Sequence, residues 1–434
     1  MDPLGAVFSV LTLVIFISSG VFALDYMKEE KNKKSFAVFF LLSMFTELAL
    51  CAASNLITFY LCYELLTVMS MPLVIHERSK EAKLAALKYL FFSLFGAYAA
   101  LFGIYNLARY SSSLDFVQGG SLSPEAFSDN RTLMLAVAMA LILGFGVKAG
   151  MWPMHAWLPT AHPIAPSPAS AALSACIVKA GVLGIIRSLW YVYGADKLRG
   201  TWVQTVFMIL ALMTVLMGST LAFKEPVLKK RLAYSTVSQV SYLLFGLAVC
   251  MGDAGVRGSD GSVIYVSDAM TGAILHVLAH GFIKAALFLT AGAIIHHTGV
   301  TKVKDMRGIG LKMPLTMTCY TIVSLGLIGI PPTGGFISKW YLATGALASD
   351  IPVFRYLGPA VLLISALLTA GYLLELMILA FFPGAEYRES IKGQEIRKEP
   401  GMLMTIPIAT LTLLSLLMGL FPEPIIELIR QVFI

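Results

Sequence analysis

Charged residues are scarce in this sequence, and their scarcity sets its class. Only 13% of the 434 residues are Asp, Glu, Lys or Arg, whereas a soluble domain carries about a quarter. Apolar residues make up 58% of the chain, and the mean hydropathy is +0.80. Many apolar stretches exceed the roughly 20 residues that span hydrocarbon, and lipid cannot solvate a backbone polar group. We therefore expect an all-α polytopic membrane protein and not a large soluble helical one.

Several motifs of cofactor chemistry are missing. None of the five cysteines forms a CxxC pair, so an iron–sulfur or zinc site is not indicated. The GxGxxG dinucleotide fingerprint and the Walker loop are also absent. No basic cluster is interleaved with aromatic residues, which argues against nucleic-acid binding. We expect a chain that holds no cofactor or metal and carries no electrons.

Hydrophobic periodicity predicts one membrane domain with about twelve transmembrane helices. The N-terminal stretch lacks a cleavable signal pattern, so we read its first apolar segment as a retained helix. The longest polar stretches, 111–130 and 384–400, are too short to be domains. The predicted helices are 4–24, 35–54, 55–76, 83–109, 131–160, 167–193, 202–223, 230–252, 268–297, 314–348, 355–383 and 402–430.

Basic residues divide unevenly between the two predicted faces. If the chain alternates sides, the loops after the odd-numbered helices receive twenty of the 32 basic residues and the opposite face receives eight. The positive-inside rule then puts the first face in the cytoplasm and both termini outside. Among the twenty are Arg388, Lys392, Arg397 and Lys398. We expect a multi-pass protein of the cell inner, or cytoplasmic, membrane in contact with the lipid bilayer.

Two predicted helices are interrupted by glycine and proline. The fifth contains GFGVKAGMWP and the tenth contains GIPPTGG. Each is fourth in a run of five helices, which predicts two five-helix repeats with the ion path at the breaks. Because five is odd, the second repeat must be inverted. The boundaries would be 1–34 for an N-terminal helix and basic loop, 35–193 and 202–383 for the repeats, and 384–434 for a polar loop and C-terminal helix. The alternative is that prolines merely kink two helices for packing.

Four lysines remain inside apolar segments once the faces are assigned: Lys148, Lys179, Lys284 and Lys339. Glu64 is also flanked by apolar residues, and it is the obvious partner for Lys148. Ionisable groups at membrane depth usually mark an ion or proton path. Loss of solvation disfavours a charged lysine and a nearby carboxylate favours it, so such a lysine can exchange a proton near neutral pH. Any single lysine could instead be a snorkelling side chain near an interface.

Three of the predicted site residues recur every four positions in HVLAHGFIKAALF. His276, His280 and Lys284 therefore line one helix face. We favour a hydrated proton relay, since the pKa of free histidine is about 6.5. Hydrogen-bonded packing histidines and a metal site are the alternatives, and the HEXXH motif is absent.

Four further ionisable residues allow two interpretations each. His155 and His162 follow the first break, where they could line an entrance or cap a re-entrant turn. Glu47 and Glu375 could belong to the path, or each could make a neutral hydrogen bond to a neighbouring helix.

Five segments in this order resemble the antiporter-like subunits shared by respiratory complex I, energy-converting membrane hydrogenases and multisubunit sodium/proton antiporters. They lie within residues 35–383: YELL, GFGVKAGMWPMHAWLPTAHPIAPSPASAALSACIVKAG, LKKRLAYSTVSQVSYL, HVLAHGFIKAALFLTAG and GIPPTGGFISKW. The resemblance implies two inverted five-helix repeats, each with a broken helix. It also implies a subunit that carries no redox centre and is driven by a partner module, among related antiporter-like subunits.

The resemblance assigns roles residue by residue. Glu64 and Lys148 match the coupling pair of one half, and Lys179 looks like the central connecting lysine. Lys229 matches a common lysine at a helix entrance. The central path of the second half would contain His276, His280 and Lys284, and Lys339 looks like the terminal proton-exchanging residue. The chain departs from the usual family pattern at Val227, where an acidic residue is frequent, and at Glu375, where a basic one is common.

Three classes of function follow. The first is a proton-translocating subunit of a redox-driven complex of the complex I or hydrogenase type, with a peripheral redox module as partner. The second is a subunit of a multisubunit sodium/proton antiporter without electron transfer. The third is a scaffold that has lost transport, against which the retained set of charged residues argues.

Overall fold

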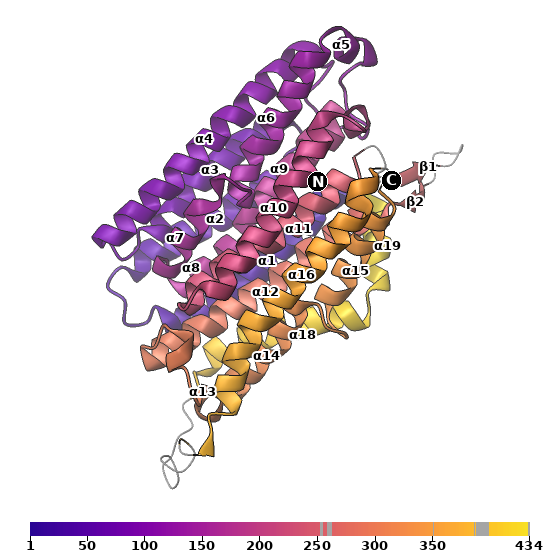
Figure 1. Ribbon diagram of the computed structural model, residues 1–434. Helices are drawn as coiled ribbons and strands as arrows, with labels where there is room; N and C mark the ends of the chain where they lie inside the picture. Colours follow the sequence, from indigo (N-terminus) through magenta and orange to yellow (C-terminus); the bar gives the residue numbers. More distant parts are fainter. Residues whose placement is uncertain (252–254, 258–262, 350, 386, 388–398, 433–434) are drawn as a thin grey trace.

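The computed structural model describes residues 1–251, 255–257, 263–349, 351–385, 387 and 399–432. Within this part of the chain, eleven helices are long and apolar enough to cross a membrane. They run side by side as an elongated bundle (Figure 1). The predicted tenth helix, 314–348, is divided into two shorter helices. The all-α multi-pass architecture is confirmed, while the basic residues predicted at 388, 392, 397 and 398 lie outside the described residues.

The first half of the chain contains most of the short helical turns. Its elements are α1 (Pro3–Tyr26), α2 (Lys33–Ala52), α3 (Leu56–Val74), α4 (Lys80–Tyr110), α5 (Pro124–Asp129), α6 (Arg131–Ala149), η1 (Met154–Trp157), α7 (Leu158–Ile164), α8 (Ser167–Ala172), η2 (Leu173–Ile177), α9 (Val178–Ser188), η3 (Leu189–Tyr193) and η4 (Ala195–Leu198). Side-chain caps set several starts: Asn55 accepts a hydrogen bond from the Thr58 amide at 2.8 Å, and Ser79 accepts one from the Ala82 amide at 3.0 Å.

The second half contains longer helices and one small hairpin. Its elements are α10 (Trp202–Lys224), α11 (Leu228–Val249), β1 (Gly255–Arg257), β2 (Val263–Val266), α12 (Asp268–Thr298), η5 (Val303–Asp305), α13 (Ile309–Lys312), α14 (Pro314–Ile328), α15 (Gly334–Leu347), α16 (Pro352–Phe381), α18 (Met402–Leu420) and α19 (Glu423–Val432). The two strands pair antiparallel. The single helix predicted over 402–430 was wrong, because α18 ends at Leu420 before Pro422 and a new helix, α19, begins at Glu423.

Both predicted helix breaks are present. In the first, α6 ends at Ala149 because Gly150 adopts a left-handed conformation with φ 78°, and η1 and α7 follow. In the second, α14 ends at Ile328 before Gly329, whose φ is 95°, and α15 resumes at Gly334. Each break leaves helix-terminal carbonyls without an intrahelical partner. The Trp157 indole satisfies one of them by donating to the Val147 carbonyl at 3.0 Å.

Corresponding helices of the two halves make corresponding contacts. In the first half, α2 packs on α3, α3 on α4, and α4 on the broken helix α6–α7. In the second half, α10 packs on α11, α11 on α12, and α12 on the broken helix α14–α15. This order of neighbours is the one expected of repeated five-helix units. The boundaries at 35–193 and 202–383 remain predictions.

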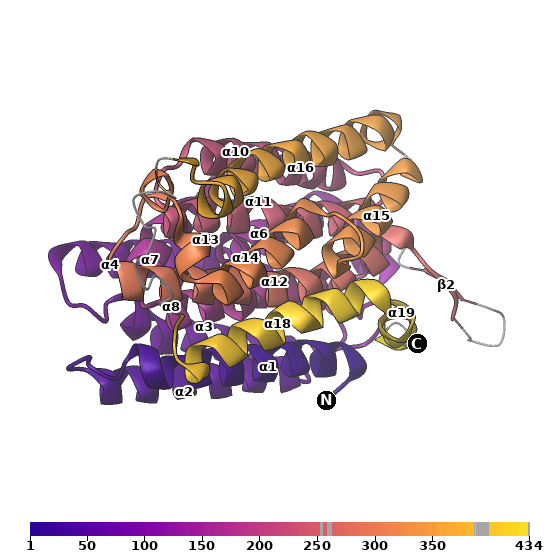
Figure 2. The ribbon, with the colours of Figure 1, turned by 90° about the horizontal axis from the view of Figure 1, so that it is seen from below.

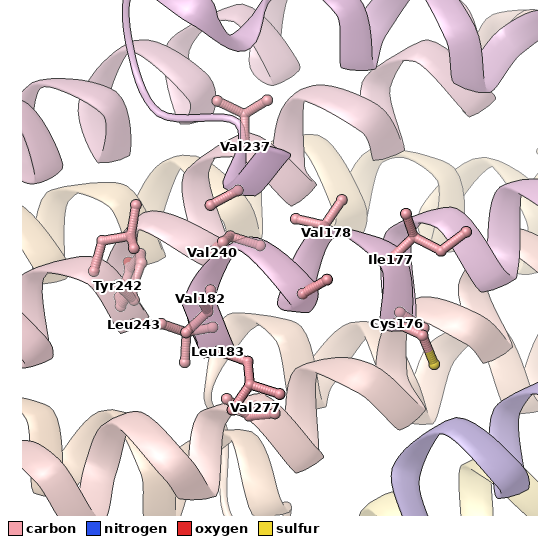
Figure 3. Packing of buried hydrophobic residues seen from close by; sticks show 14 of the residues in the cluster. Cys176, Ile177, Val178, Val182, Leu183, Val237, Val240, Tyr242, Leu243 and Val277 are labelled. Atoms are coloured by element: carbon pink, nitrogen blue, oxygen red, sulfur yellow. The ribbon is translucent and has the colours of Figure 1, made fainter. Parts of the chain in front are cut away.

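The centre of the bundle lies where the two halves meet. Seen from below, α10 and α16 run along one side and α1 and α2 along the other, with α12 between them (Figure 2). Val182 and Leu183 of α9, Val240 and Leu243 of α11 and Val277 of α12 close this contact (Figure 3). The segment from α8 to η3 and the helices α11 and α12 are almost wholly buried. These buried helices carry most of the predicted site residues.

Candidate functional site

Lys148 is fully buried at the last turn of α6 and points at α3. Its Nζ donates to the Thr67 hydroxyl at 2.7 Å and to the Tyr63 carbonyl at 3.2 Å. The same nitrogen lies 4.1 Å from the centre of the Tyr63 ring. The cation is therefore solvated by one hydroxyl, one carbonyl and one aromatic face. Thr67 and Tyr63 were not predicted, although both lie within one turn of Glu64.

Two glutamates lie near this lysine without pairing with it. Glu64 is partly exposed on α3, and Glu47 is buried on α2; each has one carboxylate oxygen without a hydrogen-bond partner. Among the described residues, no carboxylate comes within ion-pair distance of Lys148. Both glutamates nevertheless interact electrostatically with Lys148, and Glu47 also does so with Lys179. Glu47 therefore faces the charged interior and belongs to this cluster.

Lys179 is fully buried just after the π-helical turn η2. A π turn shifts the backbone hydrogen bonds to a spacing of five residues, and such turns are frequent at functional sites. The Lys179 ammonium donates to the Ser174 carbonyl at 2.7 Å, within that turn. The Ser174 hydroxyl in turn shares a hydrogen bond of 2.8 Å with Thr236 of α11. These contacts fix Lys179 at the junction between the two halves.

The row on α12 is buried as expected. His276 and His280 have ring centres 5.7 Å apart, and three imidazole nitrogens, Nε2 of His276 and both of His280, have no partner. Lys284 is fully buried and donates to the Leu232 carbonyl at 2.8 Å and to the Ser235 hydroxyl. His280 interacts electrostatically with the lysines on both sides of it, Lys179 and Lys284. The row therefore contacts α11 through Lys284 and interacts electrostatically with Lys179 of α9.

Lys229 and His162 form a second buried approach to this row. Lys229 was counted with the cytoplasmic face, but its side chain is 7% exposed and its ammonium donates to the Ala165 carbonyl at 2.5 Å. His162 is fully buried, stacks on Phe288 at 4.8 Å and interacts electrostatically with both Lys229 and Lys284. His155 is partly buried in η1, at the first break. The structure thus brings His162 to the interior and leaves His155 nearer the surface.

Lys339 is partly buried and follows the second break. Its ammonium donates to the Leu327 carbonyl at 2.5 Å and the Ile328 carbonyl at 3.1 Å, so it caps the end of α14. The Tyr242 ring lies 5.0 Å from its Nζ and also stacks on His276, with ring centres 5.8 Å apart. Tyr242 therefore connects Lys339 with the row on α12. Lys148 lies just before the first helix break, whereas Lys339 lies after the second.

Glu375 and two buried arginines form ion pairs outside this cluster. Glu375 pairs with Arg231 at 2.8 Å. Arg187 forms a two-pronged pair with Asp2 and lies between the rings of Phe116 and Tyr191. Both arginines were predicted to lie at the membrane faces, whereas they are 4% and 1% exposed. The residues next to each arginine in the sequence gave no signal of its acidic partner.

The described residues contain no group of three or more His, Cys, Asp or Glu side chains that could hold a metal ion. The cluster instead consists mainly of ammonium groups bound to carbonyls and hydroxyls, and of imidazoles. Ammonium groups of this kind donate hydrogen bonds, and each imidazole can donate or accept one.

This chain is similar to proteins of three kinds. It is 33% identical over 440 aligned positions to the NADH-quinone oxidoreductase subunit N of Desulforudis audaxviator (strain MP104C), covering 99% of this chain and 83% of the relative. It is 33% identical over 347 positions to the hydrogenase-4 component B of Escherichia coli (strain K12), covering 79% and 50%. It is 31% identical over 430 positions to the Na(+)/H(+) antiporter subunit A1 of Staphylococcus aureus (strain JH9), covering 97% and 52%. The chain spans about half the length of the last two relatives.

Two solved structures share the fold. A chain of the membrane-bound sulfane sulfur reductase, an archaeal respiratory membrane complex, superimposes with a TM-score of 0.83 at 22% identity, covering 99% of this chain and 81% of that one. A chain of the Mrp complex from Dietzia sp. DQ12-45-1b gives 0.82 at 20% identity, covering 100% and 83%. The sequence model of the family described as NADH:quinone oxidoreductase/Mrp antiporter, transmembrane, matches residues 53–369. The chain belongs to this family of proton-antiporter membrane subunits.

Proposed function

We propose that this chain translocates protons as a subunit of a redox-driven membrane complex. The observation that carries the proposal is a line of buried ionisable groups across both halves. It runs from Lys148 through Lys179 to His280, and then by His276 to Lys339, with Lys284 beside His280. Each member interacts electrostatically with the next, or with a group between them. Charged groups at membrane depth are costly to bury, and where they occur they usually mark an ion path.

The chemistry of these groups suits proton exchange. A buried ammonium bound to carbonyls and hydroxyls can release a proton and remain hydrogen-bonded as an amine. The unpaired imidazole nitrogens of His276 and His280 can each accept or donate a proton, directly or through water. Gln239 also has both side-chain polar atoms buried without a partner, on the helix that faces this row. We infer that water binds at these atoms and completes the path.

Glu64 supports the assignment of neighbouring membrane subunits. Its carboxylate lies on the part of α3 where Leu61 is 62% exposed and Leu65 is 46% exposed. A carboxylate beside a lipid-facing surface is costly, so another subunit is expected to cover this part of α3. That subunit would then influence whether Glu64 is charged, and the charge on Glu64 would in turn favour the protonated form of Lys148. We propose Glu64 and Lys148 as the coupling pair of the first half.

We infer the reaction that drives transport from the proteins to which this chain is similar. NADH-quinone oxidoreductase subunit N matches almost the whole chain and 83% of its own length, which favours a partner that transfers electrons, including a peripheral redox module. The similarity to Na(+)/H(+) antiporter subunit A1 supports a second candidate, sodium/proton exchange without electron transfer. We place the chain in the cytoplasmic membrane with both ends outside, on the distribution of its basic loops.

The test uses the complete complex purified with this chain and reconstituted in proteoliposomes. Iron–sulfur or nickel subunits and proton uptake driven by electron transfer are expected. Lys148→Ala and Lys339→Ala should each lower uptake by at least about tenfold, as expected if a barrier rises by about 1.4 kcal/mol. Lys80→Ala, at an exposed lysine, should leave it unchanged.

Two other results would each reject a part of this proposal. A sodium-dependent exchange in a complex without redox subunits would replace the redox-driven function by the antiporter function. Unchanged uptake in both lysine variants would contradict a transport role for this chain and leave a scaffold.

A further inference from the structure

A groove between α1 and α2 lies outside the proton path and has a distinct chemistry. It encloses about 490 Å³ and is lined by apolar residues over most of its length. That volume falls in the range of about 300–1,000 Å³ that is typical of small-molecule sites. Because both helices span the membrane, the apolar part of the groove faces hydrocarbon.

Aromatic residues make the floor of the groove rigid. Phe36 and Phe40 are each 4% exposed, and their rings stack with centres 5.4 Å apart. Phe16 of α1 lies 5.0 Å from Phe40 and joins the two helices. Leu24 and Leu41, 66% and 49% exposed, form the two edges. The groove is thus a fixed furrow with exposed apolar edges.

A glycine keeps one end of the furrow open. A Cβ built at Gly20 would meet only the Phe40 ring, at 3.7 Å, which is an ordinary contact distance. Gly20 and Met27, both in the lining, are seven residues apart on α1, which corresponds to about 10 Å along the helix. The open furrow therefore extends about two turns into the membrane from its basic end.

Three lysines surround the other end. Lys28, Lys33 and Lys34 line the groove where α1 ends and α2 begins, and all three are exposed. Lys33 donates to the Lys28 carbonyl at 3.1 Å, which draws it toward the loop. Among the described residues, no acidic side chain forms an ion pair with any of the three. Asp25, Glu29 and Glu30 lie in the same part of the chain but form no ion pair with these lysines. An apolar furrow that ends in three lysines without an ion-pair partner matches a molecule with a hydrocarbon tail and an anionic head.

We propose that this groove binds an anionic phospholipid, with one acyl chain along Phe36 and Phe40 and the phosphate between the three lysines. Basic pockets between membrane helices on the cytoplasmic side recognise anionic headgroups in this way. A helix of another subunit fits less well, since its apolar surface would leave the three ammonium groups without a counter-charge. The site is independent of the proposed proton path.

The test measures the lipid kept by the full chain in its complex. The complex is incorporated into nanodiscs of phosphatidylcholine with a minor share of phosphatidylglycerol, extracted in mild detergent and analysed by native mass spectrometry. The wild type should retain phosphatidylglycerol in preference to phosphatidylcholine. Changing Lys28, Lys33 and Lys34 together to Gln should lower that retention roughly tenfold or more, since each lysine contributes to headgroup binding.

Two further variants make the result specific. Lys31, Lys302 and Lys304 changed together to Gln remove the same charge from exposed positions outside the groove and should leave retention unchanged. Gly20→Leu places a large side chain in the furrow, where its Cβ would make only an ordinary contact with Phe40. It should reduce retention of both lipids at this site without unfolding the chain.

Equal phosphatidylglycerol retention in the groove variant and its control would overturn the proposal. So would the loss of a copurifying membrane subunit from Gly20→Leu with retention unchanged, because the occupant would then be a protein.

Discussion

His276 shares a hydrogen bond of 2.8 Å between its Nδ1 and the hydroxyl of Ser338, the residue just before Lys339. The bond joins the histidine row of α12 to the second half of the broken helix. The bond can form with either neutral tautomer of His276, because the serine hydroxyl can donate or accept. A change of charge at His276 is therefore felt by a side chain next to Lys339 on α15.

Replacing Ser338 should slow transport without unfolding the chain. Ser338→Ala removes the partner of His276, and a neutral hydrogen bond contributes about 0.5–1.5 kcal/mol. We expect a fall of roughly threefold to tenfold in proton uptake by proteoliposomes of the complex. Ser415→Ala is the matched control, since Ser415 is also buried, on α18, but its hydroxyl has no partner. Equal uptake in the two variants would contradict a role for the His276–Ser338 bond.

Asp2 should stabilise the fold in a pH-dependent manner. Burial raises the pKa of the Asp2 carboxyl, but the Arg187 guanidinium more than offsets this and holds the pKa below the ordinary value of 3.8. The charged form therefore stabilises the folded state above that value, and the contribution disappears as the pH falls through the lowered pKa. Asp2→Asn should lower the free energy of unfolding by about 1–3 kcal/mol at neutral pH.

The measurement is thermal unfolding in detergent at several pH values. The difference between wild type and Asp2→Asn should shrink as the medium becomes strongly acidic. Asp196→Asn is the control, because Asp196 is 70% exposed and lies 4.0 Å from Lys197, and exposed pairs of this kind contribute little. A difference that persists unchanged in acid would contradict the assignment of the ion pair.

Glu375 should matter for stability and not for transport. Glu375→Gln leaves Arg231 buried without its counter-charge, although the Arg231 side chain still donates to the Glu225 and Tyr372 carbonyls. We expect a loss of about 1–3 kcal/mol in the free energy of unfolding, with unchanged proton uptake per folded complex. Glu423→Gln, at an exposed residue, should change neither. A selective loss of uptake in Glu375→Gln would return this residue to the path.

Close packing at Gly181 should hold Lys148 of α6 and Lys179 of α9 in place. A Cβ at this position would lie 2.5 Å from the Phe145 carbonyl oxygen and 2.7 Å from the Ala149 nitrogen. Gly181→Ala must therefore separate α9 from α6, and we expect lower thermal stability and a loss of uptake. Gly20→Ala is the matched control, since its Cβ meets only an ordinary contact, and it should be neutral or slightly stabilising. Normal function in Gly181→Ala would show that the lysines tolerate a wider spacing.

Local sequence signals predicted the helices and their breaks, because glycine and proline act on the backbone where they stand. Gly150 and Gly329 end their helices as expected. The pairing of distant side chains had no such signal: Arg231 and Glu375 are 144 positions apart. Arg187 was placed at a surface because a basic residue near the end of an apolar run resembles a topology marker. Its burial depends on Asp2 and two aromatic rings brought there by tertiary packing. The contacts of Tyr242 with His276 and Lys339 likewise depend on the packing of α11 against α12 and α15, which the sequence does not show.

The cap that Lys339 places on α14 links protonation to mechanics. The ammonium group neutralises the negative end of one half-helix while it is covalently attached to the other, so its charge holds the two segments together. A neutral amine donates fewer hydrogen bonds and no longer attracts that helix end by charge. Under the proposed function, loss of a proton from Lys339 would weaken the contact between α14 and α15, and its return would strengthen it. The residue would act as both a carrier and a latch.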